Sequence, residues 1–308
     1  AGFNEYTMLT GDEWKALHAP MPYHAPPPAK SGGGASYVLR AAGCVLLHAA
    51  IMRMHTHCVV TCTCSALRVH EFMLVCCREA VQQRRLAKDR LRGRSLQAPS
   101  TADHRIAGAV QPIANQGSCG ASYAFATAAV MEAYFFYANA DDSALSAQQL
   151  VDCTSNVGNS GCSGGSLAST LEWSTAYALC TANDYPWVGS TQTCATSCTP
   201  VVQGTGVYYP TSETDLRDQT VISVTAGVVD FSTTDVQNYA SGVFTGSCSS
   251  SSSAGNTAVA LVGYGTSGSG AYWVVRNSRG TSWGMYGYMH LLRGVNKCGV
   301  ANQPAAMS

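Results

Sequence analysis

The chain has 308 residues with 18 basic and 18 acidic side chains, so its formal net charge at pH 7 is zero. The charge is unevenly divided: residues 1–97 carry 12 Lys and Arg against 6 Asp and Glu, whereas residues 98–308 carry 6 against 12. An acidic C-terminal block lacks the basic footprint that nucleic acids require, so we expect no nucleic-acid partner.

The 14 cysteines also form two groups, six within residues 44–77 and eight within residues 119–298. An even number of cysteines scattered through a Gly- and Ser-rich block is typical of disulfide-bonded proteins from oxidising compartments. We therefore expect the secretory pathway, with an extracellular, lysosomal or vacuolar destination, although no signal peptide is recognisable in this sequence. The longest uncharged apolar stretch, residues 41–52, is too short to span a bilayer, so no membrane span is expected.

The first 97 residues divide into two parts. Residues 1–34 end in a Pro- and then Gly-rich stretch, which is the composition of a linker. Residues 35–97 match no pattern that we can place, and their composition differs from both flanks. Their cysteines are spaced C-x3-C-x-C, which fits no common zinc module, so no metal site is predicted. The block is either a genuine insertion or the product of an error in gene prediction.

The segment that organises the rest covers residues 116–125 and reads Q-G-S-C-G-A-S-Y-A-F. The apolar run over residues 123–138 predicts one long helix that is buried on all sides. Ser122 then lies where this helix begins, and its hydroxyl is either a cap or first-turn group, or a nucleophile. A serine nucleophile needs a neighbouring base, because its hydroxyl is barely ionised at neutral pH.

From about residue 221 the pattern changes to short β-type runs separated by Gly and Ser. The runs cover residues 221–224, 228–231, 258–264, 271–276 and 286–292. A helical part over about residues 98–210, followed by a strand-rich part over about residues 211–308, predicts an α+β protein with two lobes.

Four sequence segments resemble those of the papain family of cysteine peptidases, in its cathepsin L-like form. They are the segment of residues 116–125, L-S-A-Q-Q-L-V-D-C at 145–153, T-A-V-A-L-V-G-Y-G at 257–265 and Y-W-V-V-R-N-S at 272–278. The resemblance implies a papain-like fold with a helical lobe and a β-barrel-like lobe, a monomeric state and no cofactor. Residues 2–14 resemble the end of the family's inhibitory propeptide, so we interpret residues 1–34 as a propeptide remnant with a linker.

The resemblance also implies a set of disulfides. Family pairing joins Cys119 to Cys162, Cys153 to Cys194 and Cys248 to Cys298. Parity then leaves Cys180 and Cys198 for a fourth bridge. We expect each bridge to stabilise the fold by roughly 2–4 kcal/mol.

The same alignment assigns the site. Gln116 holds the position of the family's oxyanion-hole glutamine and Asn277 that of the asparagine that orients the catalytic histidine. Ser122 stands where the family has the nucleophilic cysteine, and Thr257 stands where it has the histidine. A threonine hydroxyl cannot take up a proton near neutral pH, so it cannot serve as a general base. The tryptophan that shields the asparagine–histidine hydrogen bond in the family is replaced by Arg279.

Two glycines and a histidine complete the candidates. Gly164 and Gly165 fit the family's G-C-x-G-G, where a substrate backbone can pair with a chain that has no side chain; a tight turn is the alternative. His290 could replace the missing base only if it reached the site, and its place in a strand argues against that.

Three functions remain open. The first is a pseudo-peptidase that binds a peptide or protein segment in the cleft between the lobes without cleaving it. The second is a peptidase or hydrolase that retains weak activity through Ser122, with a base from a carboxylate, a partner or the substrate. The third is a decaying or mis-assembled gene product without function. The residues favour the first, because the scaffold positions are kept whereas the catalytic ones are replaced.

Overall fold

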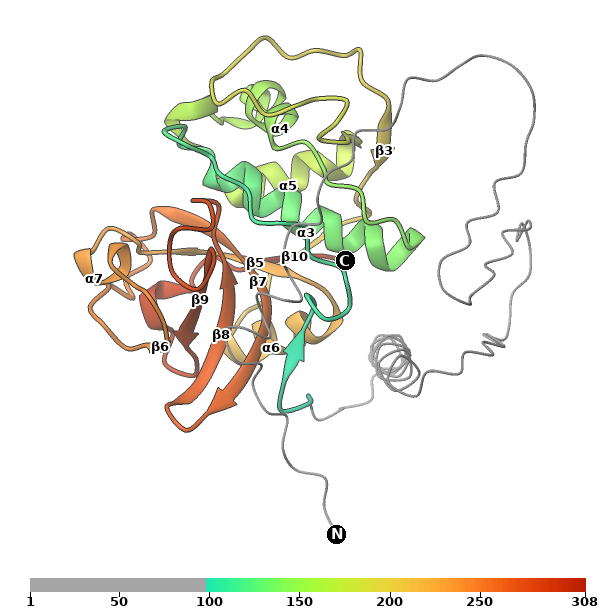
Figure 1. Cartoon of the computed structure of the whole chain (residues 1–308). Coiled ribbons are helices and arrows are strands. Elements are labelled where there is room, and N and C mark those ends of the chain that lie inside the picture. The colour runs from blue at the N-terminus through green and yellow to red at the C-terminus, as the bar shows by residue number, and fades with distance from the viewer. Residues whose placement is uncertain (1–97) are drawn as a thin grey trace, which may run out of the picture. The chain divides into compact units, whose positions relative to one another are not determined.

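A computed structural model describes residues 98–308 of the chain (Figure 1). The propeptide remnant, the linker and the inserted block, all predicted for residues 1–97, lie outside the described residues. The division of residues 98–308 near residue 210 likewise stays a prediction.

Residues 98–308 contain five α-helices, three short 3-10 turns and ten strands. The helices are α3 (Ser122–Asn139), α4 (Ala147–Cys153), α5 (Leu167–Ala176), α6 (Glu213–Ile222) and α7 (Thr234–Gln237), and the turns are η1 (Ser155–Val157), η2 (Gly161–Ser163) and η3 (Lys297–Gly299). The strands are β1 (Ala102–Asp103), β2 (Leu179–Cys180), β3 (Pro200–Val202), β4 (Val207–Tyr208), β5 (Thr225–Val229), β6 (Val243–Phe244), β7 (Thr257–Ser267), β8 (Gly270–Arg276), β9 (Tyr288–Leu292) and β10 (Ala305–Met307). Helices α3, α4 and α5 gather on one side, and the large sheet lies on the other (Figure 1).

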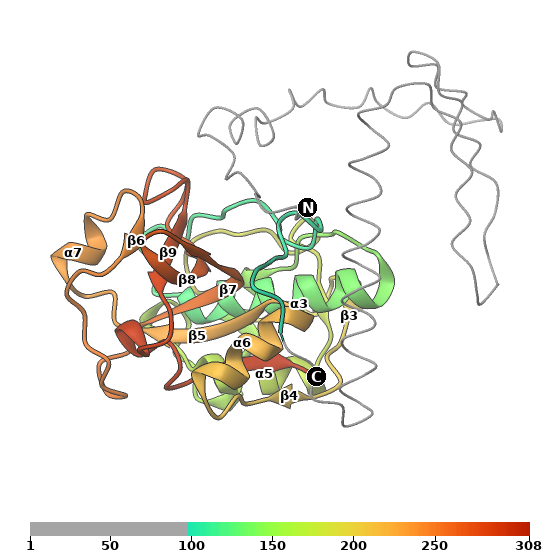
Figure 2. The same ribbon diagram turned by 90° about the horizontal axis from the view of Figure 1, so that it is seen from below.

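Helix α3 is the element on which both sides pack. It contacts α4 and α5 in one direction and strands β5, β7 and β10 in the other, and Figure 2 shows α3 beside β5 and β7. Twelve of its 18 residues are buried, which confirms the buried helix predicted for residues 123–138. Even so, no helix within residues 98–308 combines the length and the hydropathy that a bilayer crossing needs.

Serine side chains fix where three of the other helices begin. The Ser146 hydroxyl accepts a hydrogen bond from the Gln149 N–H at 2.9 Å, and α4 starts at the next residue. Ser166 caps α5 and Ser212 caps α6 in the same way. Each cap satisfies a backbone N–H that has no partner within its helix.

The strands form one eight-stranded sheet and one small pair, β2 with β3. The order in the large sheet is β4-β10-β5-β7-β8-β9-β6, and β1 pairs separately with β7. All neighbours are antiparallel except β6 and β9. Strand β7 is buried from Thr257 to Gly265, because α3 packs against it while β5 and β8 border it. The two ends of the described chain, β1 and β10, both join this sheet.

One of the predicted strands is wrong. Val221 and Ile222 were expected in a strand over residues 221–224, but they form the last turn of α6, and the strand β5 starts at Thr225. The cap Ser212 and the acidic Glu213 and Asp215 in the first turn favour a helix there. These local signals outweigh the β-branched residues at the helix end.

The structure contains four disulfides: Cys119–Cys162, Cys153–Cys194, Cys180–Cys198 and Cys248–Cys298. These are the pairs that the resemblance and parity implied. The first three lie within residues 119–198, the part that holds α3, α4 and α5, and the fourth joins two loops of the strand-rich part.

Two titratable side chains are buried where the halves meet. Glu132 of α3 accepts a hydrogen bond from the Leu145 N–H at 3.1 Å, and burial raises the pKa of its carboxyl to about 7 against the opposing effect of Arg276. The His104 ring contacts the Tyr137 hydroxyl at 2.6 Å and the Thr220 carbonyl oxygen at 2.7 Å. Burial lowers the pKa of His104, so its ring is held neutral.

Candidate active site

Ser122 is the first residue of α3 and lies at the boundary with the sheet. The residue before it, Ala121, occupies the N-cap position and offers no side-chain cap. The Ser122 Oγ instead accepts a hydrogen bond at 3.2 Å from the N–H of Ala258 in β7. The hydroxyl therefore contacts the backbone of the opposite half rather than its own helix.

Thr257 opens β7 immediately before Ala258, and its side chain bonds to its neighbour in the chain. Its hydroxyl donates to the Asn256 Oδ1 at 2.8 Å, and only 4% of the residue is exposed. The Asn256 amide then donates to Asp230 at 3.1 Å. Position 257 is thus tied into a polar network on the strand side of the site.

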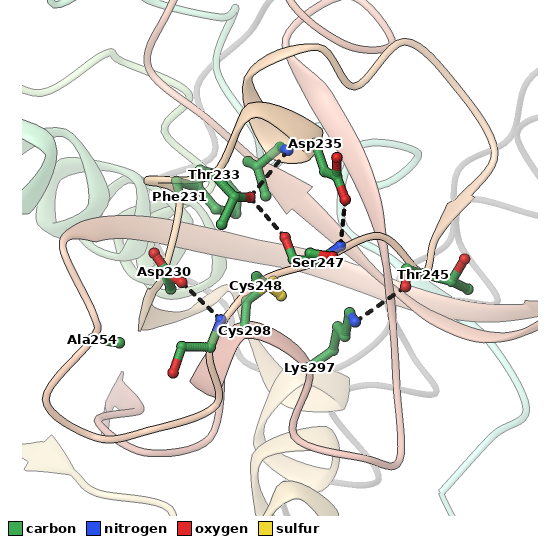
Figure 3. The surroundings of a disulfide bond; sticks show 12 residues. Asp230, Phe231, Thr233, Asp235, Thr245, Ser247, Cys248, Ala254, Lys297 and Cys298 are labelled. Atoms are coloured by element: carbon green, nitrogen blue, oxygen red, sulfur yellow. Dashed lines mark hydrogen bonds between the residues drawn. A yellow bond between two sulfur atoms is a disulfide. The ribbon is translucent and has the colours of Figure 1, made fainter.

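This network leads to a disulfide. Asp230 also accepts from the Ser232 hydroxyl at 2.6 Å and from the Ser249 N–H at 2.7 Å, beside the Cys248–Cys298 bridge (Figure 3). The hydrogen bond from the Ser232 hydroxyl is the largest of the effects that hold the pKa of Asp230 below its ordinary value. An ionised carboxylate whose oxygens already accept these hydrogen bonds is a poor base for Ser122.

Asn277 directly follows β8 and is 3% exposed. Its Oδ1 accepts from the Ser278 N–H at 2.8 Å, whereas its Nδ2 is buried with no hydrogen-bond partner among the described residues. Asn277 lines a cavity of about 10 Å³ together with Phe125, Ala258 and Arg276. A volume of that size holds about one water molecule. No imidazole lies among the residues that line this cavity in the described part of the chain.

Gln116 connects the start of α3 to the loop after β8. Its Oε1 accepts from the Ser278 hydroxyl at 2.6 Å, and its Nε2 donates to the Cys119 carbonyl oxygen at 2.7 Å. A primary amide has two N–H donors, so one remains for a ligand near Ser122. The Gln116 N–H also donates to the Ser278 carbonyl oxygen at 2.8 Å, which fixes the backbone on this side of the site.

Neither histidine of residues 98–308 serves the site. His104 is enclosed between Tyr137 and Thr220, as described above. The ring of His290 in β9 stacks on that of Tyr272 with 4.1 Å between centroids, and burial lowers the pKa of His290 to about 4. Within the described residues, the hydrogen-bond partner of the Ser122 hydroxyl is a backbone N–H, not an imidazole or a carboxylate.

The two glycines predicted to bind substrate differ in their surroundings. Gly164 has φ +119, and a Cβ there would meet nothing within 4 Å, so its backbone is open on that side. A Cβ on Gly165 would lie 2.5 Å from the Asn159 side chain and 2.8 Å from the Tyr123 ring. Gly165 is therefore required by packing against α3, whatever it does for a ligand.

Arg279 lies on the rim of the site. It forms an isolated antiparallel bridge with Asn115, flanked by the hydrogen bonds from Gln116 to Ser278 and from Gly280 to Ala114. Its side chain is exposed. The backbone position is therefore rigid, while the guanidinium extends into solvent.

Comparison with known proteins identifies the chain. The sequence pattern described as "Papain family cysteine protease" matches residues 98–308. The chain belongs to the papain family of cysteine proteases. The α+β papain-like fold predicted from the sequence is thereby confirmed, since solved structures of such proteases superpose on it.

Two relatives and two solved structures illustrate the similarity. The chain is 34% identical to cysteine proteinase 2 of Entamoeba histolytica over 68% of its own length and 69% of that protein. It is 35% identical to a cathepsin L-like proteinase of Fasciola hepatica over 66% of its own length and 64% of that protein. The proform of the ragweed pollen allergen Amb a 11 superposes with a TM-score of 0.65 at 32% identity, covering 69% of this chain and 66% of that one. The Carica candamarcensis protease CMS1MS2 in complex with E-64 superposes with a TM-score of 0.63 at 32% identity, covering 68% of this chain and 98% of that one.

The partners of the side chains at these positions could not be predicted from the sequence. The Thr257–Asn256–Asp230 network was missed, because Asp230 lies 26 residues before Asn256 and neither of these two stands in a recognised motif. A signal was present, since Ser232 and Ser249 flank turns near Asp230, but serines are frequent throughout this chain. The Ser278–Gln116 contact was likewise invisible across 162 residues.

Proposed function

We propose that this papain-family protein binds a peptide or protein segment between its lobes and does not cleave it. The observation that carries the proposal is the environment of Ser122, whose hydroxyl accepts from the Ala258 N–H and has no base as a partner within residues 98–308. The hydroxyl of Thr257, at the position of the family's histidine, donates a hydrogen bond to its neighbour Asn256. Without a general base a serine hydroxyl stays protonated and is a weak nucleophile.

The parts that would bind a chain segment are kept. Gly164 leaves backbone open beside the start of α3, and the Gln116 amide retains an N–H near Ser122. An oxyanion hole with binding alone leaves roughly 10³–10⁴-fold acceleration over water in triad hydrolases, which is negligible for a peptide bond. The four disulfides support an oxidising compartment of the secretory pathway, and we propose that the protein acts there as a monomer.

A second candidate is weak hydrolysis through Ser122, favoured by the names of the relatives, which are cysteine proteinases. The proton would then go to a base supplied from outside residues 98–308, by the substrate or by a partner. Labelling of Ser122 by a fluorophosphonate, lost in Ser122→Ala, is the signature that this candidate requires.

The deciding experiment compares the full-length chain with a variant that carries both Ser122→Cys and Thr257→His. Each is incubated with a broad pool of fluorogenic peptides, beside both single variants and Ser122→Ala. We expect cleavage only by the double variant, which would show that a base and a thiol are all that the site lacks. Turnover by the unmodified chain that Ser122→Ala abolishes would establish the second candidate instead.

A further inference from the structure

The basic side chains of residues 98–308 are almost all committed to partners. Arg105 pairs with Asp103 at 2.6 Å and Arg217 with Asp218 at 2.7 Å. Arg276 donates to the Pro112 carbonyl oxygen at 2.8 Å and is 8% exposed.

The remaining two committed cations lie over aromatic rings. The Arg293 guanidinium is 4.9 Å from the centroid of the Tyr264 ring. Lys297 lies over the Phe244 ring and donates to the Thr245 carbonyl oxygen at 3.2 Å. Among the described residues, Arg279 is the one Lys or Arg side chain with no carboxylate, carbonyl or ring partner.

This uncommitted cation stands beside the candidate active site. Its backbone is bridged to Asn115, the neighbour of Gln116, and it follows Asn277 by two residues. Asn277 and Ala258 line one cavity, and the Ala258 N–H binds the Ser122 hydroxyl. The backbone of Arg279 is therefore held next to the residues of the candidate site, and its side chain is exposed.

The polar groups that remain at this place are mainly donors. Asn277 offers a buried Nδ2 that has no partner within residues 98–308, Gln116 offers its second amide N–H, and Ser122 offers its hydroxyl proton. No carboxylate forms a hydrogen bond with any of the three in the described part of the chain. A set of donors beside a free guanidinium complements an anion, because charge-assisted hydrogen bonds to a carboxylate satisfy both.

The other charged residues within 98–308 bear on how selectively Arg279 can bind an anion. Residues 98–308 carry 12 acidic against 6 basic side chains, so their net charge does not attract an anionic ligand. A peptide carboxylate that reaches the site must therefore be held by a specific cation. We infer that Arg279 selects ligands that present a carboxylate beside Ser122, and this inference rests on the peptide-binding function proposed above. The carboxylate is either the C-terminus of the bound peptide or an Asp or Glu side chain within it.

The test uses the full-length chain and three random hexapeptide libraries. One has free C-terminal carboxylates, the second is amidated and lacks Asp and Glu, and the third is amidated with one Glu fixed at each position in turn. Affinity selection followed by mass spectrometry identifies the bound peptides. We expect enrichment from the first or the third library, which tells the terminal carboxylate from the side chain, and little from the second.

The best peptide is then measured by fluorescence anisotropy against Arg279→Gln, Arg279→Lys and the matched control Arg217→Gln, which removes the same charge from α6. We expect Arg279→Gln to weaken binding about tenfold, in line with the loss of one charge-assisted hydrogen bond. Arg279→Lys should retain part of the affinity, and Arg217→Gln should change it less than about twofold. Equal enrichment from all three libraries, or unchanged binding by Arg279→Gln, overturns the inference but leaves peptide binding intact. Failure of every library to bind overturns both.

Discussion

The α3 side and the strand side of the candidate site differ in how their groups are bonded. On the α3 side, the Cys119–Cys162 bridge and the hydrogen bonds of Gln116 fix the backbone, and Gly164 leaves it open. On the strand side, the Thr257 hydroxyl donates to Asn256, whose amide donates to Asp230. The α3 side therefore presents open backbone, whereas the strand-side hydroxyl is already bonded within the protein.

Gly165 and Asn277 make the same contrast in single residues. Gly165 has no room for a Cβ between Asn159 and Tyr123, so packing alone keeps it a glycine. Asn277 keeps a buried Nδ2 with no partner among the described residues, beside a cavity that holds about one water molecule. A fold that is intact around a site therefore says little about the reaction.

The largest expected effect comes from removing the Cys119–Cys162 disulfide on the α3 side. Replacing Cys119 and Cys162 together by serine should lower the free energy of unfolding by roughly 2–4 kcal/mol, because the bridge closes a segment between residues 43 apart. Urea denaturation of the full-length chain measures this. The matched variant without Cys248 and Cys298, which are 50 apart, should lose a similar amount. A loss confined to one of the two would mean that the two sides do not contribute equally to stability.

The second effect is a pH dependence that originates in α3. The pKa of Glu132 is raised to about 7 from an ordinary 4.5, so the folded state favours its protonated form. This contribution to stability is fully present below about pH 4.5 and is lost as the pH rises to about 7. The shift corresponds to about 3 kcal/mol in the free energy of unfolding, taking 1.36 kcal/mol for each pKa unit.

His104 acts in the opposite direction, because burial lowers its pKa: as the pH falls below about 6.5 the unfolded chain takes up a proton that the folded ring resists, so stability decreases. The measurement therefore compares the chain with Glu132→Gln by urea denaturation at pH 5 and pH 8. Glutamine can still accept the Leu145 N–H but does not titrate. If both proteins change equally between the two pH values, Glu132 does not titrate in this range.

These effects mark the limits of what the sequence predicts. The apolar run after Ser122 predicts α3 and its burial, because a helix that is apolar on all sides is stable in the interior of the protein. The sequence does not single out Glu132, since one carboxylate in that run has no visible partner; its partner Leu145 lies beyond the end of the helix. Likewise the motifs place Ser122 and Thr257, but not the direction in which their hydroxyls point.

A smaller effect tests the strand side. Thr257→Val keeps the shape of the side chain and removes the hydroxyl that donates to Asn256 at 2.8 Å. The Asn256 amide still donates to Asp230, so we expect a loss of about 1 kcal/mol in the free energy of unfolding, the usual value for one hydrogen bond. Thr257→Ser is the control, since it keeps the hydroxyl. A loss in the serine variant as large as in the valine variant would assign the effect to the methyl group rather than to the network.

The smallest effect is expected for a substitution of Ser122, the first residue of α3. Ser122→Ala removes one 3.2 Å contact to the Ala258 N–H, at the upper end of hydrogen-bond length. Alanine is also a good residue for the first turn of α3, so the two changes nearly cancel, and stability should shift by less than about 0.5 kcal/mol. Affinity for a selected peptide should fall only slightly, because the donors at Gln116 and Arg279 remain. A large loss of affinity with unchanged stability would mean that the Ser122 hydroxyl is the main donor to the ligand rather than one of several.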